Sequence, residues 1–162
     1  MRPLARLSEY IFASPRWLHW CAGLLFAGIR CRLAYTFLAA GVIKVQSWQT
    51  TLALFADEYH VPLLSPTIAA YLGTGIELVL PPLLALGFLT RPTAFALFVF
   101  NAVAATSYPD ISEAGIKDHV YWGLLLAVLA LQGGGWLSLD RLLAAPLLRR
   151  FGGKPSAPEN SR

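Results

Sequence analysis

Four polar side chains interrupt otherwise apolar stretches of this sequence, and each could carry a proton or hold a ligand: Lys44, Glu77, Asn101 and His119. Glu77 lies near the middle of an apolar run, residues 67–91, that is long enough to cross a bilayer at roughly 1.5 Å per residue. An ionised acid at that depth costs about 2.5 to 3.5 kcal/mol on insertion scales. We therefore expect this carboxylate to be ion-paired, to be protonated or to take part in the function of the protein.

In a functional interpretation, Glu77 accepts and releases a proton and His119 relays it from the entrance of a cleft. These two are the candidate catalytic residues, and the candidate ligand-binding residues are Lys44, Asn101, Gly41 and Gly73. The ligand would be a small molecule or a quinone headgroup. A structural interpretation remains open, in which Glu77 is a buried, ion-paired or protonated acid that sets the helix register. Lys44 then snorkels to the surface, Asn101 joins two helices and His119 is solvated.

The sequence contains no motif that indicates another class of cofactor or partner. It contains no metal-ligand spacing, haem motif, phosphate loop or nucleophile elbow, so we expect no metal site and no intrinsic cofactor. The basic pI of about 9.3 is not accompanied by a recognition motif, so we predict no nucleic-acid partner. Cys21 and Cys31 do not form a CxxC pair. Two alternatives stay open for Cys31: an inert thiol, or one activated by the flanking arginines.

The elements that must position these side chains are membrane helices. Hydrophobic residues make up 56% of the chain and charged residues only 14%, which is too apolar for an ordinary soluble domain. We therefore predict an all-α membrane protein, a four-transmembrane-helix bundle with amphipathic interfacial helices. The membrane domain is expected over residues 32–137, with spans at about 32–48, 67–89, 92–108 and 119–137.

Three segments are expected to lie outside these spans. Residues 1–31 form a basic N-terminal segment whose apolar stretch, residues 17–29, is short for a crossing and is predicted to be an interfacial or partly embedded helix. Residues 48–59 have one apolar face and predict an amphipathic helix on the outer surface. Residues 138–162 predict a cytoplasmic amphipathic helix followed by a disordered tail.

The second predicted span has an inward-facing stripe at helical spacing, formed by Ala70, Gly73, Glu77, Pro81 and Leu84. The first two spans run in opposite directions, and side chains lean toward the N-terminus of their own helix. The Lys44 side chain therefore leans toward the cytoplasmic side of the membrane, and the Glu77 side chain leans toward the outer side. This brings the two within reach of an ion pair.

The distribution of basic residues predicts the orientation. With both termini in the cytoplasm, eleven of the thirteen Lys and Arg residues lie on the cytoplasmic side, and the opposite orientation would invert this ratio. This places the four polar side chains in the outer half of the bilayer. The predicted site is thus a cleft that opens to the extracytoplasmic side of the membrane.

Several motifs in their order and spacing resemble the DoxX-like family of small bacterial integral membrane proteins. The motifs are FLAAGVIKVQSW with Gly41-x-x-Lys44, TGIELVLPPLLALGFLTRP with Glu77, KDHVYWGLLL, and GGGWLSLD. The resemblance runs from Arg32 to Asp140, and it implies structural or topological roles for Arg32, Arg91 and Asp140. It also implies a multi-pass protein of the bacterial inner membrane.

The same resemblance implies a membrane subunit of a redox assembly, linked to quinone or to thiol and sulfur chemistry, or of a stress-response assembly. In that case the chain would be an oxidoreductase subunit. Its expected partners are the lipid bilayer, membrane or soluble redox proteins, and other copies of itself in a homo-oligomer. Two alternatives remain: a non-catalytic scaffold or anchor for soluble partners, and a transporter of small solutes or metal ions. The transporter is disfavoured because a single acid and no inverted repeat make a poor permeation path.

Overall fold

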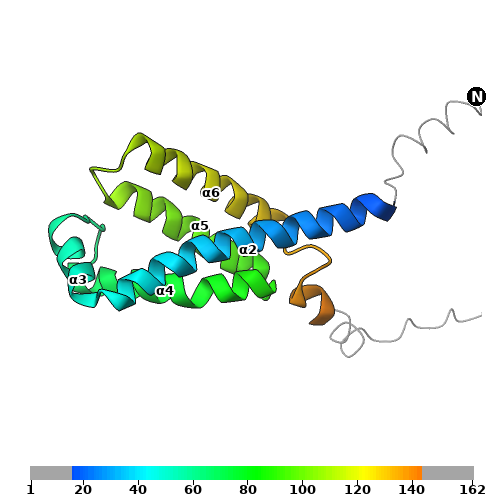
Figure 1. Cartoon of the computed structure of the whole chain (residues 1–162), viewed down its shortest axis with the longest axis horizontal. Helices are drawn as coiled ribbons and strands as arrows, with labels where there is room; N and C mark the ends of the chain where they lie inside the picture. Colours follow the sequence, from blue (N-terminus) through cyan, green and yellow to red (C-terminus); the bar gives the residue numbers. More distant parts are fainter. Residues whose placement is uncertain (1–15, 144–162) are drawn as a thin grey trace, which may run out of the picture.

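The computed structural model describes residues 16–143, and all regular structure in this part of the chain is helical (Figure 1). The helices are α2 (Arg16–Gln46), α3 (Trp48–Asp57), α4 (Pro66–Leu86), α5 (Thr90–Ser107) and α6 (Glu113–Gln132). The prediction of an all-α protein is confirmed. Residues 1–15 and 144–162, which include the predicted tail and most of the predicted last helix, lie outside the described residues.

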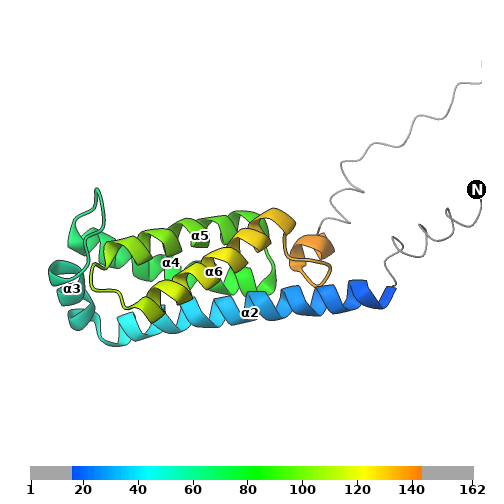
Figure 2. The same cartoon turned by 90° about the horizontal axis from the view of Figure 1, so that it is seen from above.

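Residues 17–29 and the first predicted span belong to one continuous helix, because α2 runs over 31 residues from Arg16 to Gln46. Residues 29–33 contain neither Pro nor Gly, so nothing in their backbone chemistry ends the helix there. Arg30 is not a surface boundary either, since it is only 2% exposed and its Nη2 donates to the carbonyl oxygen of Leu137. Both views show the N-terminal part of α2 extending beyond the other helices (Figures 1 and 2).

The long helices pack around one apolar core. α2 packs mainly against α4, and α5 packs mainly against α6. The core residues, drawn from all four of these helices, are Leu33, Phe37, Leu84, Ala94, Leu97, Leu126 and Leu129. The predicted inward stripe of the second span is confirmed, because Ala70, Gly73, Glu77, Pro81 and Leu84 are all buried in α4.

The short helix α3 covers one end of this bundle (Figure 2). Its residues Thr51 and Phe55 are buried, and Phe55 forms a second apolar cluster with Ala69 and Ala70 at the start of α4. The amphipathic helix predicted at residues 48–59 therefore turns much of its apolar face toward α4. This contact closes the end of the bundle at which the polar side chains of the candidate site lie.

The start of α6 differs from the prediction, which began the last span at about residue 119. The helix begins at Glu113, because the Ser112 side chain caps it by accepting a hydrogen bond from the backbone N–H of Gly115 at 3.1 Å. It ends at Gln132, where Gly133 takes a φ of 85° that favours glycine. Residues 133–137 form a loop rather than the end of a span, and His119 lies in the second turn rather than at the helix start.

Three helices in residues 16–143 are long and apolar enough to cross a membrane by length and composition: Trp17–Gln46, Pro66–Leu86 and Glu113–Gln132. Many large apolar side chains on these helices are exposed, among them Tyr35, Ile43 and Leu124. Exposed apolar surface of this extent is typical of helices that contact lipid. The structure is therefore that of a helical membrane protein.

Candidate functional site

Lys44 and Glu77 form an ion pair between α2 and α4. Lys44 Nζ lies 2.5 Å from Oε1 and 2.6 Å from Oε2 of Glu77, so one ammonium group binds both carboxylate oxygens. The Glu77 side chain is 6% exposed and that of Lys44 is 22% exposed. At such burial each charge depends on the other for compensation, because removing either one leaves an unpaired charge in an apolar surrounding.

Gly41 allows this pairing because it lets the two helices approach closely. A Cβ atom at Gly41 would lie 2.9 Å from the Glu77 Cβ and 3.1 Å from the Glu77 backbone carbon. Only a residue without a side chain fits at that distance. Gly41 was predicted to bind ligand, but the structure places it against the backbone of Glu77, one turn before Lys44.

Asn101 and His119 form a second polar pair, between α5 and α6. Asn101 Nδ2 donates to the backbone oxygen of His119 at 2.8 Å, and Asn101 Oδ1 lies 2.9 Å from Nδ1 of the His119 ring. The ring also contacts Trp122 edge-on, with 5.1 Å between the ring centroids. Asn101 therefore joins the two helices and holds the imidazole in one orientation. Within residues 16–143 this pair shares no hydrogen bond with Lys44 and Glu77.

A cavity of about 440 Å³ connects the two pairs at the end of the bundle covered by α3. Lys44, Glu77, His119 and Gly73 line it, whereas Asn101 and Gly41 are not among its lining residues. Most of the remaining lining is apolar or aromatic and includes Phe37, Phe55, Tyr59, Ile76, Phe100 and Trp122. The cavity is thus an apolar chamber with a few polar groups directed into it, which is the usual composition of a small-molecule site.

Ser107 and Tyr59 are among the polar residues of this cavity that the sequence analysis missed. Ser107 lines the cavity, is 1% exposed, and its Oγ has no hydrogen-bond partner among the described residues. Tyr59 also lines it, and burial, followed by the nearby Tyr108 and acidic groups, raises the pKa of the Tyr59 phenol, so its hydroxyl stays protonated at neutral pH. A lone Ser at a helix end and a Tyr on an amphipathic face carry no motif that would single them out.

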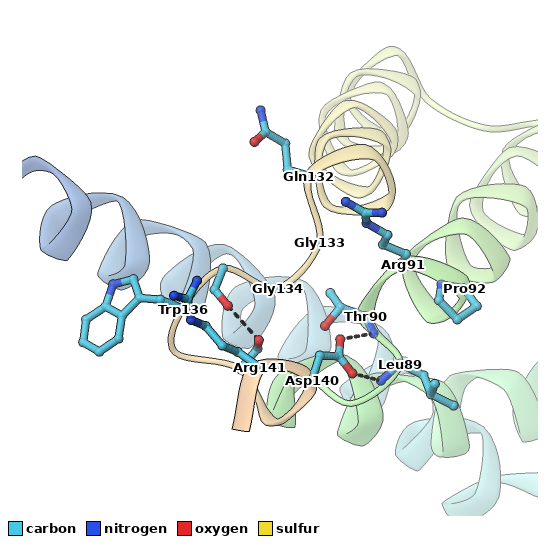
Figure 3. A pocket seen from close by; sticks show the side chains of 12 residues that line it. Leu89, Thr90, Arg91, Pro92, Gln132, Gly133, Gly134, Trp136, Asp140 and Arg141 are labelled. Atoms are coloured by element: carbon cyan, nitrogen blue, oxygen red, sulfur yellow. Dashed lines mark hydrogen bonds between the residues drawn. The ribbon is translucent and has the colours of Figure 1, made fainter. Parts of the chain in front are cut away.

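None of the three predicted topology residues lines this cavity. Arg32 is exposed on α2 and donates from Nη1 to the Thr36 hydroxyl at 2.7 Å. Arg91 and Asp140 lie at the opposite end of the bundle, where they line a second pocket (Figure 3). There the two carboxylate oxygens of Asp140 accept the backbone N–H groups of Leu89, at 2.6 Å, and Thr90, at 2.8 Å.

Replacing Asp140 with alanine is expected to lower the free energy of unfolding by about 1 to 2 kcal/mol, because the first N–H groups of α5 lose their acceptors. Denaturant unfolding of the purified chain in detergent, followed by circular dichroism, measures the change. Asp118→Ala removes an exposed acid of α6 and serves as the control. Equal stability of the two variants would contradict the capping role of Asp140.

The remaining candidate groups are not gathered into a site. Cys21 and Cys31 are both free and exposed on α2. In the described part of the chain, no three His, Cys, Asp or Glu side chains come together in a way that could hold a metal ion. The two pockets at the ends of the bundle are therefore the places to consider for ligand chemistry.

Comparisons with known proteins agree with this architecture. The family model described as DoxX matches residues 15–109, which include Lys44, Glu77 and Asn101. A protein of Haemophilus influenzae that is described as uncharacterized is 32% identical over 129 residues, covering 75% of this chain and 85% of that protein. No solved structure gives a significant match.

Proposed function

Because this chain belongs to the DoxX family of membrane proteins, we propose that it is a membrane subunit of a redox assembly whose α3-end cavity binds a quinone headgroup. One observation carries the proposal. The ion pair of Lys44 and Glu77 and the unpartnered hydroxyl of Ser107 line the same, otherwise apolar cavity. Buried polar groups that line an apolar chamber are what a flat, largely apolar ligand with polar edges requires.

The proposed topology has four crossings with both termini in the cytoplasm of a bacterium, in its inner membrane. The fourth crossing is α5, which packs along α6 and has 18 residues, or about 27 Å at 1.5 Å per residue. This is close to the roughly 30 Å of a bilayer core. The positive-inside rule then directs the α3 end, and with it the cavity, toward the periplasm.

The residues present fit a quinone headgroup. Phe37, Phe100 and Trp122 supply aromatic surface on which a ring can stack. The Ser107 hydroxyl can donate a hydrogen bond to one carbonyl oxygen of the ring, because it has no partner within the described chain. The Lys44 ammonium group can donate to another, since its three donors are not all used by the two oxygens of Glu77.

A quinone takes up two electrons and two protons when it is reduced to a quinol. In this proposal the electrons come from a partner redox protein, and the chain itself handles protons. Glu77 holds and releases a proton, and Lys44 stabilises its carboxylate when the proton has left. His119, oriented by Asn101, exchanges protons between the cavity and the periplasmic side.

The Glu77→Gln variant tests this proposal. We expect the dissociation constant for decylubiquinone to rise about tenfold, or about 1.4 kcal/mol, because the amide disrupts the ion pair that orients the Lys44 ammonium group. Quenching of tryptophan fluorescence in detergent reports binding, since Trp122 lines the cavity. Glu113→Gln, which changes a 93% exposed carboxylate on α6, is the matched control.

Two outcomes would overturn the proposal. If the wild-type chain shows no saturable decylubiquinone binding, the non-catalytic scaffold or anchor becomes the better interpretation. The same holds if the Glu77→Gln and Glu113→Gln variants bind decylubiquinone with equal affinity. Retained capture of a soluble partner by the Glu77→Gln variant would then support the scaffold directly.

A further inference from the structure

We propose that the pocket at the opposite end of the bundle binds a phosphate group, supplied by a phospholipid headgroup or by free phosphate. This pocket has a volume of about 510 Å³ and is formed by the start of α5, the loop after α6 and the residues up to Arg141. Figure 3 shows its lining residues. It shares no lining residue with the cavity at the α3 end, so the proposal is independent of the quinone site.

Buried donors without partners gather around this pocket. Six buried side-chain nitrogen and oxygen atoms in the described residues have no hydrogen-bond partner, and four of them belong to this end of the bundle. They are Oγ1 of Thr90, which lines the pocket, Nε and Nη1 of Arg30, which lies behind the loop at Gly134, and Nε1 of Trp136, which lies against Gly23 of α2. Thr90 is fully buried and Arg30 is 2% exposed. Because an unsatisfied buried donor is costly, the Thr90 hydroxyl calls for an acceptor in the pocket that it lines.

Glycines bring the backbone beside the pocket into close contact with Arg30 and Thr90. A Cβ atom at Gly134 would lie 2.6 Å from the Thr90 hydroxyl oxygen and 2.9 Å from Nη1 of Arg30. A Cβ atom at Gly87 would overlap the same guanidinium nitrogen. The loop at Gly134, which lines the pocket, therefore passes directly over Arg30 and Thr90. Any larger residue there would displace one of them.

The charges around the pocket favour an anion. Arg91 and Arg141 both line it, and Figure 3 shows them on opposite sides of the loop at Gly133 and Gly134. The one acid in the lining, Asp140, already accepts two backbone N–H groups at the start of α5. The N-terminus of α5 is thus occupied by Asp140, and the excess positive charge comes from the arginines.

A phosphate group matches this set of donors. Its oxygens accept several hydrogen bonds at once, and the planar guanidinium group of arginine is suited to binding two of them. A phospholipid is the favoured source, because the pocket lies at the end of helices that are long and apolar enough to span a membrane. Trp17, Trp20, Leu24 and Leu25 on the nearby part of α2 expose apolar surface for acyl chains. Basic pockets at this level between membrane helices commonly hold lipid headgroups.

Native mass spectrometry of the full chain released from detergent tests the proposal. The probes are phosphatidylglycerol, diacylglycerol with the same acyl chains, and inorganic phosphate. We expect one saturable site for a phosphate-containing probe, whose dissociation constant rises about tenfold, or about 1.4 kcal/mol, in Arg91→Gln and in Arg141→Gln, which each remove an arginine that lines the pocket. Thr90→Val, which removes only the hydroxyl, is expected to weaken binding severalfold. Binding of phosphatidylglycerol alone identifies a lipid as the source, and binding of inorganic phosphate identifies free phosphate.

Arg32→Gln is the matched control, because Arg32 is exposed like Arg91 and Arg141 but does not line this pocket and donates to the Thr36 hydroxyl. It is expected to bind both probes like the wild-type chain. If Thr90→Val does not fold, Arg91→Gln and Arg141→Gln decide the question. The proposal is overturned if these variants bind as tightly as Arg32→Gln, or if diacylglycerol binds as tightly as phosphatidylglycerol.

Discussion

Replacing Lys44 with methionine is expected to lower the free energy of unfolding by about 3 to 5 kcal/mol, because it leaves the Glu77 carboxylate buried without its counter-charge. The Glu77 side chain is 6% exposed and its two oxygens have no other hydrogen-bond donor among the described residues than Lys44. Methionine keeps the length of the aliphatic stem, so the change removes the charge with little loss of packing. Unfolding of the purified chain in mixed micelles by increasing denaturing detergent measures the difference.

Two further variants separate the ion pair from other causes. Lys44→Met combined with Glu77→Gln is expected to recover much of the lost stability, because the unpaired charge is then absent. Lys117→Met removes the lysine of an exposed pair with Glu113, in which the atoms are 3.9 Å apart and the side chains 79% and 93% exposed. That control is expected to change stability by less than about 1 kcal/mol. Similar losses in Lys44→Met and Lys117→Met would show that the buried pair is not a stabilising contact.

Replacing Gly41 with leucine is expected to lower the free energy of unfolding by about 3 kcal/mol, at the upper end for overpacked cores. Even the first carbon of the new side chain would lie 2.9 Å from the Glu77 Cβ and 3.1 Å from Leu78 Cδ2. The helices α2 and α4 must then move apart, which also lengthens the Lys44–Glu77 contact. The same micelle unfolding assay measures the change.

Gly28→Leu provides the matched control in the same helix. No atom lies within 4 Å of a Cβ at Gly28, so leucine fits there, and its higher helix propensity is expected to leave stability unchanged or raised by about 0.5 to 1 kcal/mol. A Gly41→Leu variant as stable as Gly28→Leu would mean that α2 and α4 are not held at the close distance seen in the structure.

Helical periodicity was the most informative part of the sequence. It predicted the inward stripe of α4, including Gly73 and Glu77, because residues three and four positions apart in a helix lie on the same face. Element boundaries were less accurate. The start of α6 was missed because Ser112 and Glu113 lie in a polar stretch that resembles a loop. A serine N-cap followed by an acidic residue in the first turn is nevertheless typical of a helix start.

The sequence by itself determined the all-α membrane class, the buried stripe of α4 and the family, since these depend on composition, local spacing and motif order. It also predicted that Lys44 and Glu77 come within reach of an ion pair. Only the tertiary structure decided what Gly41 contacts, that Asn101 orients the His119 ring, and that Arg30 binds the carbonyl of Leu137, 107 residues away. Such partners depend on how far apart two helices lie and how each is rotated about its axis. The distance and the rotation are set by packing among distant segments, so a local sequence pattern does not determine them.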